Sequence, residues 1–208
     1  MISDFDKYLL NKDSPANFNI RLGDIVQDMH NGFFKGNPTW NDLNFEGTAL
    51  STGNSAPDLI SLFGSGGIIG RGFDGGNTTE QLFGGSEILH DYKEGTDIHF
   101  HLHWMPTTTG LGNVKWQLEY TWQNIDGTFS TPETLELISA AGGTAWKHNK
   151  GEFEPINGTG MKIGSHILFR IFRIPTDEQD TYSADAALLS VGIHYQINST
   201  GSSEIYKK

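Results

Sequence analysis

The residues best suited to chemistry lie in one short stretch, residues 97–104, with the sequence DIHFHLHW. Three of the chain's eight histidines alternate there with apolar residues. Because successive side chains of a β-strand point to opposite faces, His99, His101 and His103 would form a stripe on one face of a strand. Imidazole binds divalent metals, exchanges protons near neutral pH and makes hydrogen bonds. The stripe therefore has three interpretations: a metal site, a contact between subunits, or a hydrogen-bonded row without special chemistry.

The first interpretation is a metalloenzyme of the cupin type, a small β-barrel whose first motif places a His-x-His pair after a glycine and a glutamate a few residues later. His101 and His103 fit the beginning of this motif. The glutamate is missing, because threonines occupy the positions where it would fall. A third ligand would have to come from another strand, with Glu119 and His194 as candidates.

The second interpretation is a contact between copies of the chain. Strands expected beside the histidine strand carry polar side chains that could pair with it across a symmetry axis. Around a threefold axis, one histidine from each subunit would form a three-nitrogen site for a metal ion or an anion. No other cofactor is expected. The residues assigned to this interface are His99, His101, His103, Gln117, Glu119 and His194, and those assigned as metal ligands are His101 and His103.

The composition of the chain indicates the kind of fold in which this histidine strand lies. The chain has 208 residues, of which 26 are glycine and 12% are aromatic, and its short apolar runs are broken by Gly, Asn, Asp and Thr. This profile favours an all-β domain with many turns. The clearest strands are residues 97–104, 113–123 and 186–198. The first two are predicted to form an antiparallel hairpin through the turn PTTTGLGN.

The other predicted strands are shorter. They are residues 59–63, 80–89, 134–139, 144–149, 165–174 and 203–206. Residues 64–77 contain seven glycines in fourteen positions, and we interpret them as a loop because neither a helix nor a Lys-Ser/Thr pair follows, as a phosphate site would need. About eight to ten strands at this spacing predict a jelly-roll-like β-sandwich.

An N-terminal arm is expected before this domain. Residues 1–38 are polar and lack strand alternation. Apolar residues between Phe18 and Met29 fall at roughly helical spacing, and Ser14 followed by Pro15 suits a helix start. The sequence therefore predicts a mostly irregular arm with one short helix at residues 1–38 and the jelly-roll-like domain at residues 39–208.

Several function classes are disfavoured by composition. The chain has no cysteine, which excludes disulfides, thiolate metal sites and a cysteine nucleophile. Its net charge is −11, and it lacks the basic cluster that a direct grip on nucleic acid requires. Its apolar runs are too short to span a membrane, and its beginning is unlike a secretory signal. Neither a G-x-S-x-G nor an H-E-x-x-H motif is present, so we expect no enzyme.

Four segments resemble a group of phage and prophage virion proteins. They are LHDYKEGTDIHFHLHW, VKWQLEYTWQNIDGTF, INGTGMKIGSHILFRIFR and DTYSADAALLSVGIHYQINSTGS, in this order within about residues 80–206. Members of the group look similar in a Tyr-Lys-x-Gly-x-Asp-Ile block with His-x-His-Trp, in a Leu-Glu-Tyr-Thr-Trp strand, and in an ending with Asp-Thr-Tyr and His-Tyr-Gln-Ile. The chain departs from the group at Leu89 and Phe100, where proline is common. The resemblance implies a virion component, and jelly rolls are common among capsid-decorating proteins, usually as trimers.

The sequence therefore predicts a phage virion structural protein, as a trimeric capsid decoration or cement protein that stabilises the head. The expected partners are further copies of the chain and the major capsid protein or other virion proteins, with no direct contact to nucleic acid or membrane. The expected location is the virion, assembled in the host cytoplasm. One alternative is a tail, head-fibre or receptor-binding component that binds a host glycan through Trp146 and Tyr182. The alternative in a different class is the cupin-like metalloenzyme.

Overall fold

The computed structural model describes residues 38–76 and 79–208. Contacts divide the chain into two units, residues 1–39 and 40–208. The helix predicted in the N-terminal arm lies outside the described residues. In the part that is described, the only helix is the 3-10 turn η1 (Leu62–Gly64), and no helix there has the length and hydrophobicity to cross a membrane.

The described residues form two β-sheets, which we call sheet A and sheet B. Sheet A has the strand order β3-β4-β11-β6-β9, and β1 also pairs with β11; sheet B has the order β2-β5-β10-β7-β8. The strands of sheet A are β1 (Thr39–Glu46), β3 (Asp58–Ser61), β4 (Ile69–Phe73), β6 (Ile98–Pro106), β9 (Asn149–Glu152) and β11 (Ala186–Ile197). The strands of sheet B are β2 (Ser51–Thr52), β5 (Gln81–Glu87), β7 (Asn113–Gln123), β8 (Glu133–Ala140) and β10 (His166–Arg173). Neighbouring strands pair antiparallel.

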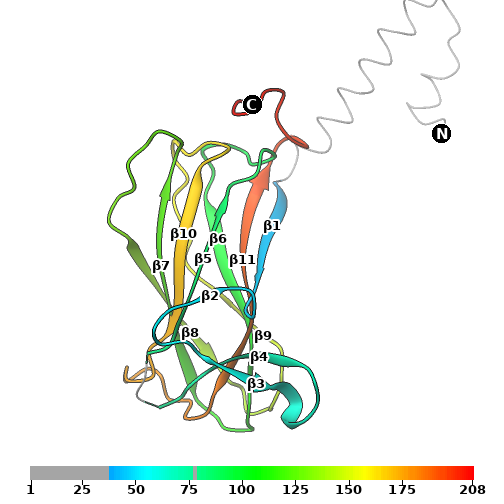
Figure 1. Ribbon diagram of the computed structural model, residues 1–208, viewed down its shortest axis with the longest axis vertical. Helices are drawn as coiled ribbons and strands as arrows, with labels where there is room; N and C mark the ends of the chain where they lie inside the picture. The colour runs from blue at the N-terminus through cyan, green and yellow to red at the C-terminus, as the bar shows by residue number, and fades with distance from the viewer. Residues whose placement is uncertain (1–37, 77–78) are drawn as a thin grey trace, which may run out of the picture. The chain divides into compact units, whose positions relative to one another are not determined.

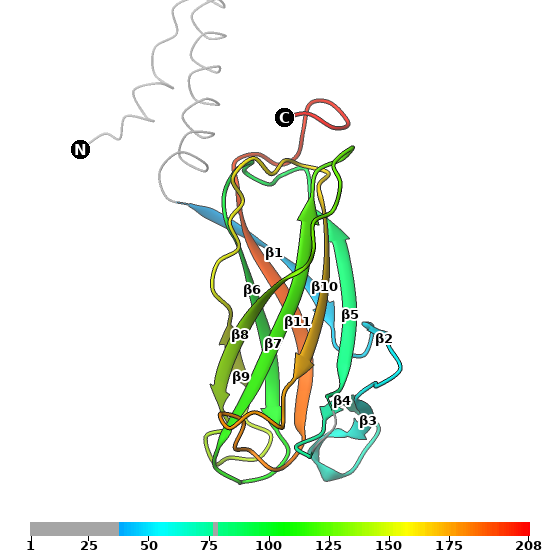
Figure 2. The ribbon, with the colours of Figure 1, turned by 90° about the vertical axis from the view of Figure 1, so that its left-hand side faces the viewer.

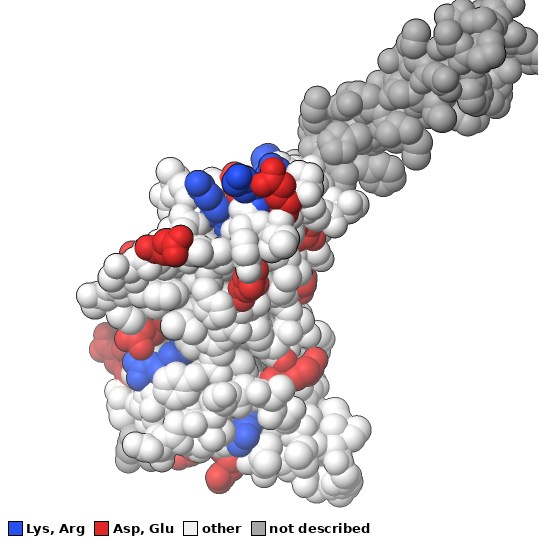
Figure 3. Space-filling model, turned by 45° about the horizontal axis from the view of Figure 1, so that its top comes forward, with Lys and Arg blue, Asp and Glu red and all other residues white. Residues whose placement is uncertain are grey.

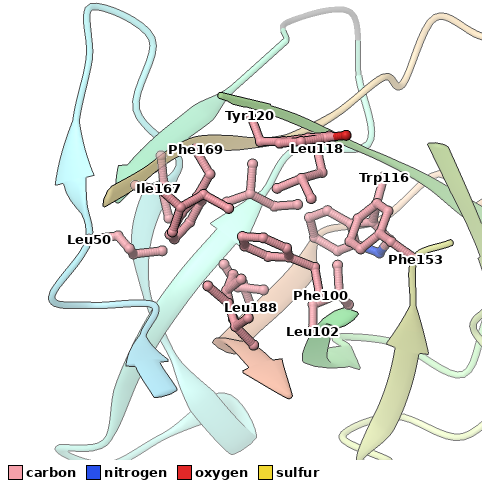
Figure 4. Close-up of a cluster of buried hydrophobic side chains, with 14 of the residues drawn as sticks. Leu50, Phe100, Leu102, Trp116, Leu118, Tyr120, Phe153, Ile167, Phe169 and Leu188 are labelled. Atoms are coloured by element: carbon pink, nitrogen blue, oxygen red, sulfur yellow. The ribbon is translucent and has the colours of Figure 1, made fainter. Parts of the chain in front are cut away.

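The two sheets are the layers of a sandwich, as Figures 1 and 2 show from two directions. The core between them is built from the apolar faces that alternation predicts. Phe100 and Leu102 of β6 are fully buried, and so are Trp116 and Leu118 of β7. Figure 4 shows these side chains converging from the two layers. Each contributes about 1.5–3 kcal/mol by leaving water. The all-β, jelly-roll-like sandwich expected from the sequence is confirmed.

The predicted hairpin between residues 97–104 and 113–123 is wrong. β6 pairs with β11 and β9 in sheet A, whereas β7 pairs with β10 and β8 in sheet B. The segment between them crosses from one sheet to the other, and the backbone N–H of Thr108 donates to the Tyr182 hydroxyl there at 2.9 Å. Two strands that face each other across a core show the same alternation as two strands in one sheet, so the sequence pattern did not separate the cases.

Three shorter elements also differ from the sequence expectation. The glycine-rich stretch 64–77, expected to be a loop, contains β4. Residues 144–148 form turns instead of a strand, and β9 begins only at Asn149. Near the end of the chain, only a single bridge joins Glu204 and Lys207, where a terminal strand was expected.

A bulge interrupts the alternation expected along β11. The pairing of β11 with β6 shifts between Leu188 and Ser190, so Leu188 and Val191 both reach the core although three positions separate them. Ala187 and Leu189, which strict alternation with Val191 would place in the core, belong instead to a smaller apolar cluster with Met105. Beyond the bulge the outward positions of β11 are the even-numbered ones, from Ser190 onward.

Candidate functional site

Five of the eight histidines gather on the outer face of sheet A. Three come from alternate outward positions of β6, one from β11 beyond the bulge, and one from the turn before β9. We call this group the histidine cluster; its members are His99, His101, His103, His148 and His194. The alternation of β6 predicted the first three, His194 was assigned to the same interface from the sequence, and the fold adds His148.

Two of these histidines converge with an aspartate of β1. The His101 and His194 rings stack with centroids 4.1 Å apart and planes at 20°. The Nε2 atom of each ring lies 3.8 Å from Oδ2 of Asp42. β1 and β6 both flank β11, so Asp42 reaches the histidines across one intervening strand. No sequence pattern pointed to Asp42, which lies in an ordinary polar stretch.

Gly192 makes this convergence sterically feasible. It pairs with His101 across the β6–β11 ladder. A Cβ atom at position 192 would lie 2.4 Å from both Cε1 and Nε2 of His101, and 3.0 Å from Oδ1 of Asp42. Real Cβ atoms do not approach that closely, so the His101 ring occupies the space that a side chain at position 192 would fill. Glycine in a strand interior often marks such a close approach.

His101 is deeply buried for a histidine, with 2% of its side chain exposed. Burial of the ring, followed by the neighbouring charge of His194, lowers the pKa of His101 to about 4, although Asp42 opposes the change. The ring is therefore neutral at physiological pH. Its Nδ1 atom is buried without a hydrogen-bond partner, and neither ring nitrogen hydrogen-bonds to any residue that the structure describes. One ring nitrogen of neutral His101 thus has a lone pair that accepts no hydrogen bond from the described residues.

The other members of the cluster have separate partners. His103 Nδ1 lies 2.7 Å from His148 Nε2, so one of these nitrogens donates a hydrogen bond to the other. Burial, followed by the charge of His148, lowers the pKa of His103. His99 packs its ring edge-on against Trp40, with centroids 5.2 Å apart.

A shallow cavity of about 290 Å³ borders the cluster and is lined by Trp40, His99, Glu152 and His194. A hydrogen bond from Lys150 lowers the pKa of Glu152 and keeps its carboxylate charged. The cavity therefore combines an aromatic wall, two imidazoles and one negative charge.

The structure separates the six residues that the sequence assigned to one interface. Four lie together on the outer face of sheet A: His99, His101, His103 and His194. Gln117 and Glu119 lie on β7, where Leu118 between them points into the core, so they face outward from sheet B. Glu119 pairs there with Arg170 at 2.8 Å. Their assignment to the histidine face is wrong, because it rested on the predicted hairpin.

His101 and His103 do not share a common ligand position. Their rings meet edge to face with centroids 5.2 Å apart, and each has a closer histidine partner. Both side chains point away from the space between the sheets, which the buried Phe100 and Leu102 fill from the same strand. The interior ligand pair of a cupin is therefore not reproduced. Of the two candidates for a third ligand, His194 approaches His101 and Glu119 does not.

The two residues assigned to glycan binding differ in exposure. Tyr182 is only 1% exposed, and its hydroxyl accepts a hydrogen bond from the Thr108 backbone. Its role as an exposed binding residue is therefore excluded. Trp146 is half-buried and lies in the left-handed region at φ 61°, with its ring 5.6 Å from that of Phe63.

Phe63 belongs to a second notable surface, at the end of the sandwich formed by β3, η1 and β4 (Figures 1 and 2). Four large apolar side chains there are between 48% and 64% exposed. We call this group the apolar hairpin surface; its members are Leu59, Phe63, Ile68 and Ile69.

No protein-family model matches the chain, and no curated protein matches it significantly. Similar solved structures include a carbohydrate-binding module of a multidomain xylanase from the hindgut metagenome of Trinervitermes trinervoides, at 12% identity over 74% of this chain and 96% of the module, with a TM-score of 0.40. A second such module, from Cellvibrio japonicus, aligns at 8% identity over 78% of this chain and 95% of its own, with a TM-score of 0.42. Infectious bursal disease virus Gx strain aligns at 13% identity over 76% of this chain and 32% of the viral one, with a TM-score of 0.38. TM-scores below 0.5 support no inference about function.

Proposed function

We propose that this protein is a non-enzymatic structural component of a phage virion, a trimeric decoration or cement protein that stabilises the head. The observation that carries the proposal is the apolar hairpin surface. Large apolar side chains exposed together on one hairpin are a feature of surfaces that bind another protein. In this proposal the hairpin contacts the capsid lattice, and the major capsid protein is the partner.

The segments that resemble phage virion proteins contribute mainly to the scaffold, which favours a structural role. The Tyr92 hydroxyl donates to the Thr96 carbonyl, and Asp97 accepts a hydrogen bond from the Gly158 backbone at 3.1 Å. Toward the other end, Arg173 forms a fully buried ion pair with Asp180. These contacts fix loops and strand ends. They would keep the shape of the domain constant. A constant shape is needed where many copies make the same contacts in one particle.

The second contact surface of the proposed assembly is the histidine cluster with Trp40, which is 44% exposed. Interface centres are depleted in charge and enriched in aromatic residues, and tryptophan is a frequent hot spot. Figure 3 shows another view in which charged side chains are scattered between broad uncharged areas. We assign the contact between copies to the histidine cluster and the contact with the capsid to the apolar hairpin surface.

The test uses the full chain and particles of the phage that encodes it. We expect sedimentation at micromolar concentration to give a trimer. Trp40→Ser should shift it toward monomer, whereas Phe63→Ser should leave the trimer intact and weaken rebinding to capsids stripped of the protein. A chain that stays monomeric at high concentration contradicts the trimer. Absence of the chain from purified particles, measured by mass spectrometry, contradicts the virion assignment.

A second candidate is a head-fibre or receptor-binding component. The observation in its favour is the surface pair of Phe63 and Trp146, because exposed aromatic rings can stack on sugar rings. Phage particles labelled with an antibody against the chain separate the two. A label spread over the head favours decoration, and a label confined to fibres or tail favours receptor binding.

A further inference from the structure

Asp42, His101 and His194 bring three potential metal ligands together, whatever the location of the protein. Each of the three residues offers one potential ligand atom, and these atoms all lie within 4.8 Å of one another. Each histidine nitrogen is 3.8 Å from the carboxylate oxygen. All three residues belong to strands of sheet A, so their Cα positions are fixed by the ladder.

These distances are close to those of an occupied metal site. A tetrahedral zinc ion at about 2.0–2.1 Å from its ligands holds neighbouring ligand atoms about 3.4 Å apart. Each observed 3.8 Å separation would need to shorten by about 0.4 Å. The His101 and His194 rings are stacked, so one ring must also rotate before both Nε2 lone pairs point at the same ion. The chain therefore brings the three donors together, and this rotation would complete the site.

The state of His101 points to an ion as the missing partner. A neutral imidazole offers one nitrogen lone pair to a metal ion. Nε2 faces the other two donors, while Nδ1 is buried without a hydrogen-bond partner. Leaving a buried imidazole without any polar partner is unfavourable. An ion at Nε2 would give the ring the partner that the described residues do not.

We propose that Asp42, His101 and His194 bind one divalent transition-metal ion, of which zinc is the representative, within a single chain. Two imidazoles and one carboxylate suit zinc and its neighbours in the transition series, whereas magnesium and calcium prefer ligand sets made of oxygen. Three protein ligands leave a coordination position open. His194 and Asp42 are each 40% exposed, so that position faces solvent or a neighbouring molecule.

The proposal assigns a role to Gly192. Any larger residue there would displace the His101 ring from its place beside Asp42, without altering a ligand. Gly192→Ala is therefore a test of geometry alone. Alanine suits the backbone at this position, because Gly192 is not among the glycines with positive φ.

The experiment titrates zinc alone into the full chain, prepared without a histidine tag and stripped with a chelator. Calorimetry is expected to give one zinc per chain. His194→Ala and Gly192→Ala should each weaken binding roughly a hundredfold, as the loss of one ligand or of its placement predicts. His166→Ala, which removes an outward-facing histidine of β10 in sheet B, should bind as the wild-type chain does. Cobalt in place of zinc should give the visible absorption of a tetrahedral site.

Three outcomes would overturn the proposal. The first is no stoichiometric uptake by the wild-type chain. The second is an equal loss of affinity in His166→Ala and His194→Ala, which would indicate non-specific binding by surface histidines. The third is loss of binding in His148→Ala with none in His194→Ala, which would place the ion at the His103–His148 pair. Thermal unfolding of each variant without metal checks that the fold is retained, and His194→Ala changes a side chain that is 40% exposed.

Discussion

Protonation of His101 should make the domain sensitive to mild acid. In the unfolded chain this histidine takes up a proton near its ordinary pKa of 6.5, whereas in the folded chain its pKa is about 4. Between these values the unfolded state binds more protons than the folded state, so the free energy of unfolding falls as the pH falls from about 6.5 to about 4. Below the pKa of His101 in the folded chain, the whole contribution of this histidine to the free energy of unfolding is lost.

The magnitude follows from the difference between the two pKa values. One pKa unit corresponds to about 1.4 kcal/mol, so a change from 6.5 to about 4 corresponds to about 3 kcal/mol. Solvent screening reduces this free-energy difference only slightly, because only 2% of the His101 side chain is exposed. The charged groups that face the ring are Asp42 from β1, His194 from β11, His103 from β6 and Lys150 from β9. Of these, only Asp42 favours the proton.

The assay is urea unfolding followed by tryptophan fluorescence, with a chelator present and at several pH values between about 7.5 and 4. His101→Gln removes the titrating group, so the wild-type curve minus the variant curve isolates its contribution. Other groups, such as His103 with its lowered pKa, titrate in both proteins and cancel. Parallel curves for the two proteins would refute the reasoning. A wild-type chain that gains stability relative to the variant in acid would mean that Asp42 holds His101 protonated.

Three further predictions follow from burial. Arg173→Met should lower the free energy of unfolding by about 3–5 kcal/mol, because it leaves the Asp180 carboxylate buried without its partner; Arg170→Met, at a partly exposed ion pair, should cost less than about 1 kcal/mol in the same denaturant titration. Gly84→Ala should destabilise by about 1–3 kcal/mol in thermal unfolding, since its Cβ would lie 2.4 Å from a core phenylalanine ring; wild-type stability would show that the core yields there. Phe63→Ser should change stability by less than about 0.5 kcal/mol, because the side chain is 53% exposed, and a larger loss in calorimetry would mean that the apolar hairpin surface is part of the fold.

Alternation along single strands was sufficient to predict the two long strands around Phe100 and Trp116 and their faces, but neither β4 nor the bulge in β11. Phe100 and Trp116 were expected in the core and are buried there, because each strand has one uniformly apolar face. Pairing was not predictable in the same way. The strands of Phe100 and Trp116 have the same apolar alternation whether they lie side by side in one sheet or face each other across the core. Which arrangement forms depends on the pairing of all the strands in the sandwich.

For the candidate site, too, the residues on one strand were predictable and their partners on other strands were not. The stripe of His99, His101 and His103 is visible in the sequence as an alternation, and the structure keeps it on one face. Asp42 is about sixty positions away along the chain, and it meets His101 only because β1 and β6 flank the same strand. Gly192 did leave a signal, since a glycine inside an apolar strand marks a close approach, but the approaching group is a tertiary fact.

Two features of the histidine cluster destabilise the isolated domain. Gly192 weakens the interior of β11, because glycine loses more backbone entropy on folding and adds no packing there. His101 is buried without a hydrogen bond to the described residues, and burial of an unpaired polar ring also costs free energy. The two are linked, because the missing side chain at position 192 makes the room that the ring occupies. Unsatisfied buried groups in a well-packed domain commonly mark functional positions, and this one lies where Asp42 and His194 converge. An ion at Nε2 of His101 would give the ring one polar partner at the point that Gly192 leaves open, while Nδ1 would keep none among the described residues.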